Sequence, residues 1–143
     1  MTAQFVTKSC FATLALGLLV GCGGGSASVG GKVTHDGAPV TGGTLQFRPI
    51  AAAGAKDPGM PSSGEIKSDG TYSLGREKEN DGAIVGRHQV IYTAPAGQLD
   101  AANAKPGDLP TPSPFEGLVP KQSEVEVKAG KNSVDIELVK PTN

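Results

Sequence analysis

The sequence predicts an all-β protein, and three observations support this prediction. Short segments alternate apolar and polar residues with a period of two, which is the pattern of half-buried strands. After residue 21, no long stretch shows the helical apolar period of about 3.6 residues. The 21 glycines and 11 prolines would interrupt helices and mark turns. Seven short strands in about 110 residues favour a seven-stranded antiparallel sandwich, although a small closed barrel fits the same pattern.

Turn residues separate the predicted strands. Asp36-Gly37 marks a turn, and Asp69-Gly70 between two alternating runs is a strong hairpin signal, because glycine adopts a positive φ without steric cost. Residues 51–62 and 76–82 are predicted to be loops. The seven predicted strands are Val29–His35, Thr44–Arg48, Glu65–Lys67, Thr71–Leu74, Ile84–Thr93, Glu124–Lys128 and Val134–Leu138.

The inward-facing positions of these strands predict an aliphatic core. The sequence has no Trp, and after residue 21 it has only four aromatic residues. In the longest strand, His88, Val90 and Tyr92 share one face. The predicted core consists of Val33, Leu45, Phe47, Ile66, Tyr72, Leu74, Val90, Val125, Val127, Val134, Ile136 and Leu138.

The N-terminal segment resembles the signal peptide of bacterial lipoproteins. Lys8 precedes a ten-residue apolar run, Phe11–Val20, which is about half the length needed to cross a bilayer. Leu19-Val20-Gly21-Cys22 then resembles a lipobox. The resemblance implies that residues 1–21 are removed and that Cys22 carries acyl chains such as palmitate, which anchor the protein in a membrane. In bacterial lipoproteins, an Asp after the cysteine usually retains the protein in the inner membrane. Here Gly23 follows Cys22, so the resemblance implies a location in the cell envelope, at the outer membrane facing the periplasm.

Processing would leave a slightly acidic chain without a disulfide. Removal of Lys8 leaves 12 basic and 14 acidic residues, a net charge of −2, which argues against a nucleic-acid partner. Cys10 is lost and Cys22 is acylated. Residues 22–28, rich in Gly and Ser, are predicted to be a flexible tether. The domain organisation is therefore signal peptide 1–21, tether 22–28 and β-sandwich 29–140.

The segment Gly30–Lys140 resembles the carboxypeptidase regulatory-like domains. Gly31–Val40 is similar to the opening strand and turn of that family, and Gly43–Phe47, Ser68–Tyr72, Gly86–Val90 and Val125–Asn132 continue the similarity. The chain looks most like short lipoproteins of planctomycete-type bacteria that carry one such domain. The resemblance implies a transthyretin-like (prealbumin-like) sandwich. The family motifs are mainly turn and core residues, so they specify a fold and not an activity. Residues 115–118 depart from the family pattern.

The sequence predicts no catalytic residue, metal site or cofactor. His35, Asp36 and His88 could contribute to a metal site, but their spacing gives no cluster of three or four ligands, so packed or solvated histidines are favoured. Glu77, Glu79 and Asp81 alternate with basic residues, which favours a solvated loop over a calcium site. Hydroxyisourate hydrolases share the transthyretin fold, but their closing Tyr-Arg-Gly-Ser signature is absent from residues 138–143. No nucleophile elbow surrounds the four serines of the Gly/Pro-rich stretches, Ser26, Ser28, Ser62 and Ser63.

These features predict a non-catalytic, lipid-anchored envelope protein whose sandwich is structural or mediates interactions. The alternative is an envelope binding module that takes a glycan, a peptide or a small apolar ligand through its loops. Residues 94–121 form the longest segment without a strand pattern. We expect Gly97–Thr111 to be flexible and Phe115–Val119 to dock on the sandwich. Partner contacts are expected in this segment and in residues 51–62.

Overall fold

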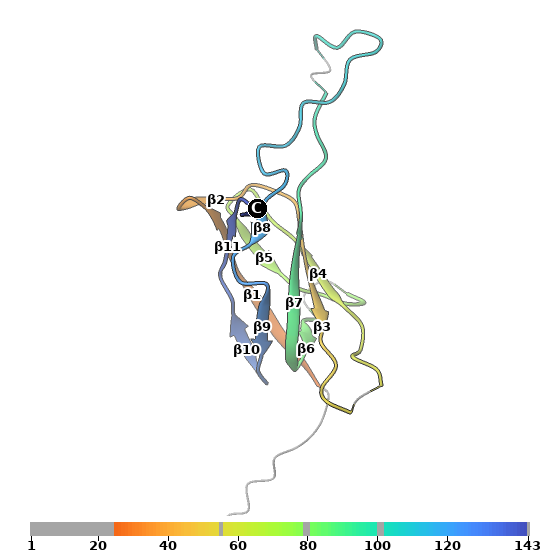
Figure 1. Cartoon of the computed structure of the whole chain (residues 1–143), viewed down its shortest axis with the longest axis vertical. Helices are drawn as coiled ribbons and strands as arrows, with labels where there is room; N and C mark the ends of the chain where they lie inside the picture. The colour runs from red at the N-terminus through yellow and green to blue at the C-terminus, as the bar shows by residue number, and fades with distance from the viewer. Residues whose placement is uncertain (1–24, 55, 79–80, 100–101, 143) are drawn as a thin grey trace, which may run out of the picture.

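The chain folds as two packed β-sheets (Figure 1). The computed structural model describes residues 25–54, 56–78, 81–99 and 102–142, and this part contains no helix. The predicted all-β sandwich is confirmed. The predicted signal peptide and Cys22 lie outside the described residues. The strands are β1 (Ser26–His35), β2 (Ala38–Pro39), β3 (Thr44–Pro49), β4 (Ser62–Glu65), β5 (Thr71–Ser73), β6 (Ala83–Ile84), β7 (Gly86–Thr93), β8 (Val119–Pro120), β9 (Glu124–Val127), β10 (Lys131–Ser133) and β11 (Ile136–Val139).

Strand β1 is the centre of the larger sheet. Along one edge it pairs antiparallel with β6, β5 and β2 in turn. Along the other edge it pairs parallel with β10 and β11, and β8 follows β11. The two parallel pairs correct the prediction of a purely antiparallel sandwich. They are possible because the intervening domain serves as the long crossover that parallel neighbours require.

Strand β1 also begins earlier than the sequence predicts. Ser26 is its first residue, and Ala27 and Val29 are buried with exposed serines beside them. Ala27 pairs with Ala83 of β6. The last three residues of the predicted tether therefore belong to the sheet, because two buried apolar positions outweigh the local Gly/Ser composition.

The smaller sheet has the antiparallel order β4-β3-β7-β9. Strand β4 covers Ser62–Glu65. The sequence prediction, Glu65–Lys67, therefore placed the start of this strand about three residues too close to the C-terminus. Ser63 of β4 and Gly75 exchange two backbone hydrogen bonds of 2.8 and 2.9 Å. This pair links the two sheets at one edge, so the sandwich is closed on that side by backbone as well as by side chains.

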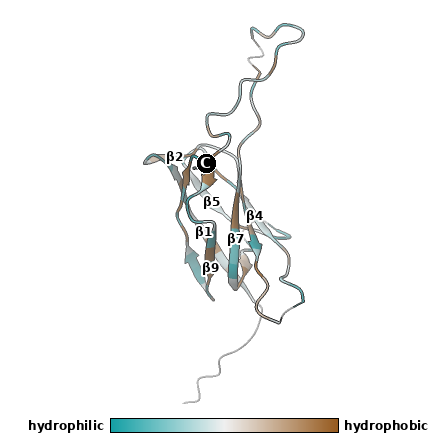
Figure 2. Ribbon diagram, in the orientation of Figure 1, coloured by the Kyte–Doolittle hydropathy of each residue, from teal (hydrophilic) through white to brown (hydrophobic). Residues whose placement is uncertain are grey.

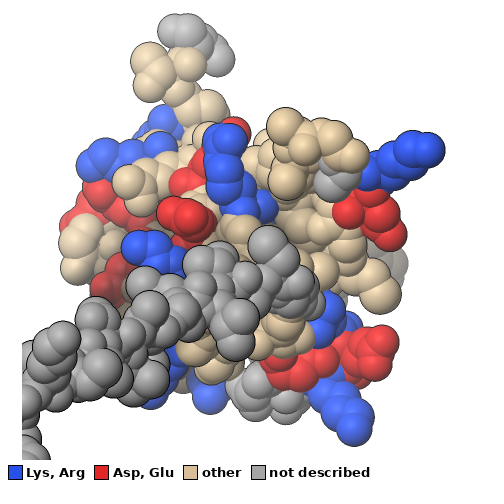
Figure 3. Space-filling view, turned by 90° about the horizontal axis from the view of Figure 1, so that it is seen from below, with Lys and Arg blue, Asp and Glu red and all other residues tan. Residues whose placement is uncertain are grey.

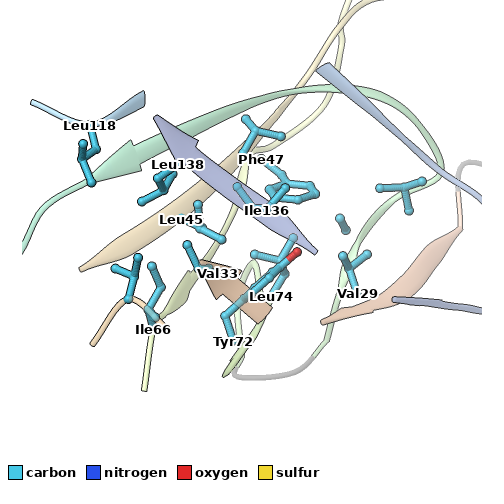
Figure 4. Packing of buried hydrophobic residues seen from close by; sticks show 14 of the residues in the cluster. Val29, Val33, Leu45, Phe47, Ile66, Tyr72, Leu74, Leu118, Ile136 and Leu138 are labelled. Carbon is cyan, nitrogen blue, oxygen red and sulfur yellow. The ribbon is translucent and has the colours of Figure 1, made fainter. Parts of the chain in front are cut away.

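The core lies between the two sheets and is almost entirely aliphatic (Figure 4). Buried and more exposed residues alternate along strands such as β3, and Figure 2 shows hydrophobic stretches of the strands in brown. Ten of the twelve predicted core residues are buried, and Val125 and Val134 are partly buried against them. The sequence prediction missed several buried positions outside the predicted strands: Ala27, Val40 and Ala83.

Close backbone packing explains the Gly30-Gly31 pair in the middle of β1. A Cβ atom on Gly31 would lie 2.1 Å from the carbonyl oxygen of Val134, which no side chain tolerates. The N–H of Val134 donates to the carbonyl of Gly30 at 2.8 Å. The buried hydroxyl of Tyr72 donates to the carbonyl of Val134 at 2.6 Å. Gly31 thus lets the segment between β10 and β11 approach β1 closely, and a Cβ atom on Gly30 would lie 2.9 Å from the carbonyl oxygen of Tyr72 in β5.

Candidate functional site: the arm and its base

A long extension leaves the sandwich between β7 and β8 (Figure 1). We call its described residues, 94–99 and 102–118, the arm. Its two limbs are held together by Gln98 and Thr111, which exchange backbone hydrogen bonds of 3.2 and 2.9 Å. Near the far end, Asp108 accepts a hydrogen bond from the N–H of Lys105 at 2.7 Å and donates its own N–H to the carbonyl of Lys105. The arm therefore has local order without belonging to either sheet.

The end of the arm that returns to the sandwich is docked. Phe115 packs against the core, and Leu118 is buried, as predicted. Val119 differs from the prediction, because its side chain is 40% exposed. Its backbone pairs with Val139 as part of β8, so the alternation of the strand turns this side chain outward. The predicted flexibility of Gly97–Thr111 stays a prediction.

A cavity of about 760 Å³ opens at the root of the arm. Its volume is in the range of small-molecule sites. Among the described residues, its lining has no charged side chain, which favours an uncharged occupant. The lining residues are Thr41, Pro95, Ala96, Gln98, Leu99, Ala102, Thr111, Pro112, Ser113, Pro114 and Phe115. Sequence reasoning missed this cavity, because its walls come from two limbs and a turn that only the fold brings together.

The arm also exposes two leucines. Leu99 is 50% exposed and Leu109 is 87% exposed. Single exposed apolar residues are common on protein surfaces. Here, however, the arm has few charged side chains around them, with Lys105, Asp108 and Glu116 the only ones among its described residues. Two exposed leucines on a weakly charged projection offer an apolar contact for another molecule.

The arm and the start of β1 lie at opposite ends of the sandwich (Figure 1). The N–H of Val85, just before β7, donates to the carbonyl of Gly25 at 3.1 Å. Strand β7 then runs from Gly86 to Thr93, and the arm follows it directly. Eight residues of strand span roughly 25 Å at about 3.3 Å each. We call the end near Gly25 the base of the sandwich.

The structure does not bring the two histidines together. His35 ends β1, and its Nδ1 donates to the carbonyl of Leu138 at 2.8 Å while Asp36 lies 3.5 Å from its Nε2. His88 is fully buried near the base, and its Nε2 donates to the carbonyl of Ile84 at 2.7 Å. Both histidines therefore have structural contacts, as the favoured interpretation predicted. Among the described residues, no group of three or more potential metal ligands converges.

The acidic loop before β6 is organised by one carboxylate. Asp81 accepts hydrogen bonds from the N–H groups of Arg76, Glu77 and Lys78. These bonds, led by that of Arg76, lower the pKa of the Asp81 carboxyl. Glu79 lies outside the described residues. Because the Asp81 oxygens are occupied by their own loop, the carboxylate has a structural role here.

Two polar atoms in the core have no hydrogen-bond partner within the described part of the chain. They are Ser62 Oγ and His88 Nδ1, and both residues are fully buried. Ser62 is the register partner of Phe47, and the His88 ring centroid lies 6.1 Å from that of Phe47. The serine and the histidine are thus enclosed in the core beside one aromatic ring and away from solvent.

The described residues include no helix that could span a membrane.

Comparisons with known proteins give one structural likeness. No protein-family model and no curated protein matches this chain. Among solved structures, the chain is similar to a DUF3823 family protein from Parabacteroides merdae ATCC 43184, with a TM-score of 0.46 and 17% sequence identity. The similarity covers 82% of this chain and 48% of that one, so the chain spans about half the length of its neighbour. A likeness at this level carries no assignment of family or activity.

Proposed function

We propose that the protein is a non-catalytic, lipid-anchored envelope protein that holds its arm away from the membrane to contact another molecule. The observation that carries the proposal is the position of the arm at the end of the sandwich opposite Gly25. With Cys22 acylated, the base would face the membrane and Leu109 would point away from it. The proposed setting is the outer membrane, facing the periplasm, with an envelope protein or a glycan as the partner.

The sequence motifs support the finer parts of this proposal. The lipobox-like Leu19–Cys22 supports the anchor, and the resemblance of Gly30–Lys140 to carboxypeptidase regulatory-like domains supports a transthyretin-like module. Such domains are scaffolds on which loops carry the contacts. The exposed leucines of the arm, with few charges near them, support contact through apolar surface.

A second candidate function is favoured by the cavity at the root of the arm. Its volume of about 760 Å³ and the uncharged side chains that line it in the described part of the chain suit a small apolar ligand. In this alternative the arm is the wall of a binding site. Native mass spectrometry of the protein purified from its envelope separates the two functions. A bound small molecule supports the alternative, and a bare chain counts against it.

The anchor and the arm contact are tested in the same cells. Fatty-acid labelling of the wild type and of Cys22→Ser should show label in the wild type only. A photo-crosslinking residue at Leu109 should capture one partner, while the same residue at exposed Lys128, near the base, should not. Equal labelling of both chains would refute the anchor. Identical crosslinks from both positions would refute a contact made by the arm.

A further inference from the structure

The base of the sandwich exposes apolar side chains of its own. Ile50 is 36% exposed and Met60 is 58% exposed, at the two ends of the segment between β3 and β4. We call Ile50 and Met60 the apolar pair. More than half of the Met60 surface and about a third of the Ile50 surface are accessible to another molecule.

The apolar pair lies beside the place where the chain enters the sandwich. The N–H of Ile50 donates to the carbonyl of Arg87 at 2.8 Å, at the start of β7. A Cβ atom on Gly59, next to Met60, would lie 2.4 Å from the side chain of Ile84. Ile84 in turn pairs with Ser26, the first residue of β1. These contacts connect both ends of the segment to the start of β1.

The length of chain before β1 determines how far the base can be from an anchor at Cys22. Three residues, 23–25, lie between Cys22 and Ser26, so four residue steps join the two. Fully extended, four residues span at most about 14 Å. Because Ser26 already belongs to β1, no longer tether can lift the sandwich. An acylated Cys22 therefore holds Ser26, at the base, within about 14 Å of the lipid headgroups.

The charges around the base favour apolar contact over electrostatic attraction. Viewed from below, basic and acidic side chains are interspersed (Figure 3). The described charged residues of the base loops and the adjoining strand ends include both signs in similar numbers: Arg48, Lys56, Arg76, Lys78, Arg87, Lys128 and Lys131 against Asp57, Glu77, Asp81, Glu124 and Glu126. Such a surface has no strong attraction to anionic lipid and no strong repulsion from it.

We propose that the base is a membrane-contact surface and that Ile50 and Met60 enter the headgroup region of the bilayer. The occupant of this surface is lipid, and the proposal rests on the lipid anchor proposed above. Two apolar side chains beside a short anchor would limit rotation of the sandwich on the membrane. The arm would then point in a fixed direction relative to the membrane, whereas the lipid anchor alone fixes only the place where the protein is attached.

Fluorescence tests this contact, because the protein contains no Trp. We would place the full chain, acylated in bacteria, in vesicles of phosphatidylcholine with and without phosphatidylglycerol. Met60→Trp should emit at shorter wavelength than in detergent-free buffer and should be quenched by brominated lipid. Leu109→Trp, at a still more exposed site on the arm, is the control and should show neither effect. Ile50→Trp gives a second reading of the base.

The outcomes separate the contact from the anchor. Intact mass of the purified chain reports whether Cys22 carries lipid, and a chain without lipid refutes the anchor and the contact together. An acylated chain in which Met60→Trp and Ile50→Trp behave like Leu109→Trp refutes the contact alone. The quenching should be the same in both vesicle types and at high salt, since the base carries both signs of charge in similar numbers. Quenching that requires phosphatidylglycerol would overturn the apolar mechanism.

Discussion

The sandwich and the arm have different physical supports within one small chain. Between the sheets, Leu45, Phe47 and Leu138 are completely buried. In the arm, Leu109 is 87% exposed, and Gln98 and Thr111 join the two limbs through a reciprocal pair of backbone hydrogen bonds. The stability of the protein therefore resides in the sandwich. The arm can change in sequence at little cost, which suits a segment that contacts a partner.

The largest expected contrast comes from truncating one apolar residue in each region. Phe47→Ala should lower the free energy of unfolding by about 3–5 kcal/mol, because it opens a cavity in a fully buried core. Leu109→Ala should change it by less than about 0.5 kcal/mol. Urea unfolding of both variants measures the difference. Similar losses in the two variants would show that the arm is part of the cooperative core.

The two tyrosines sharpen the comparison at an intermediate scale. Tyr72 lies in the core and donates to the Val134 carbonyl at 2.6 Å, while Tyr92 reaches the carbonyl of Gly42, near the arm, at 3.3 Å. Tyr72→Phe should lower the free energy of unfolding by about 1–2 kcal/mol, because the buried carbonyl of Val134 loses a hydrogen-bond donor. Tyr92→Phe should lower the free energy of unfolding by less. Equal losses of unfolding free energy, measured in urea, would mean that the shorter and more buried hydrogen bond of Tyr72 stabilises the protein no more than that of Tyr92.

The same tyrosines predict an alkaline limit. Burial, with a smaller contribution from the charge of Asp135, raises the pKa of the Tyr72 phenol, and burial also raises that of Tyr92. A raised folded-state pKa gives stability that is fully present below the unfolded value of about 10 and is lost as the pH rises above it. Absorbance of tyrosinate should therefore appear at higher pH in the folded protein than in guanidinium. Coincident titrations would contradict the burial of Tyr72.

The smallest expected effect comes from shortening the arm. Replacing residues 97–112 with Gly-Gly should change the free energy of unfolding by less than about 1 kcal/mol, since loop-closure entropy varies slowly with length. The limbs are close enough to join, because a Cβ atom on Gly97 would lie 2.6 Å from the carbonyl of Thr111. Thermal unfolding measures the change. A large loss would show that the arm supports the sandwich.

Much of the sandwich could be predicted from the sequence, because burial follows a period of two. Leu45 and Phe47, or Ile136 and Leu138, alternate with polar residues and are buried as predicted. The boundaries were harder to predict where composition and burial disagree. Ser26 and Ser62 lie in Gly-, Ala- or Pro-rich segments, yet both begin strands. The parallel pairing of β1 with β10 and β11 has no local signal, since both hydrogen-bonding partners are distant in sequence.

The candidate site could be predicted only in part. The position of the arm and the docking of Phe115 follow from a long strand-free segment that ends in apolar residues. The cavity at the root of the arm and the apolar pair at the base could not be predicted from sequence. Both depend on which turns meet at each end of the sandwich, and that is decided by the register of β1 and β7.

The central position of β1 has a mechanical consequence. A chain held by lipid near its N-terminus and by a partner at the arm would be pulled along the strand direction. Strand β1 has neighbours on both edges, so such a load acts in shear on two ladders at once. Hydrogen bonds loaded in shear must break together, whereas those at a peeling edge break one after another. Under such a load, β1 would therefore be the strand that resists extraction most strongly.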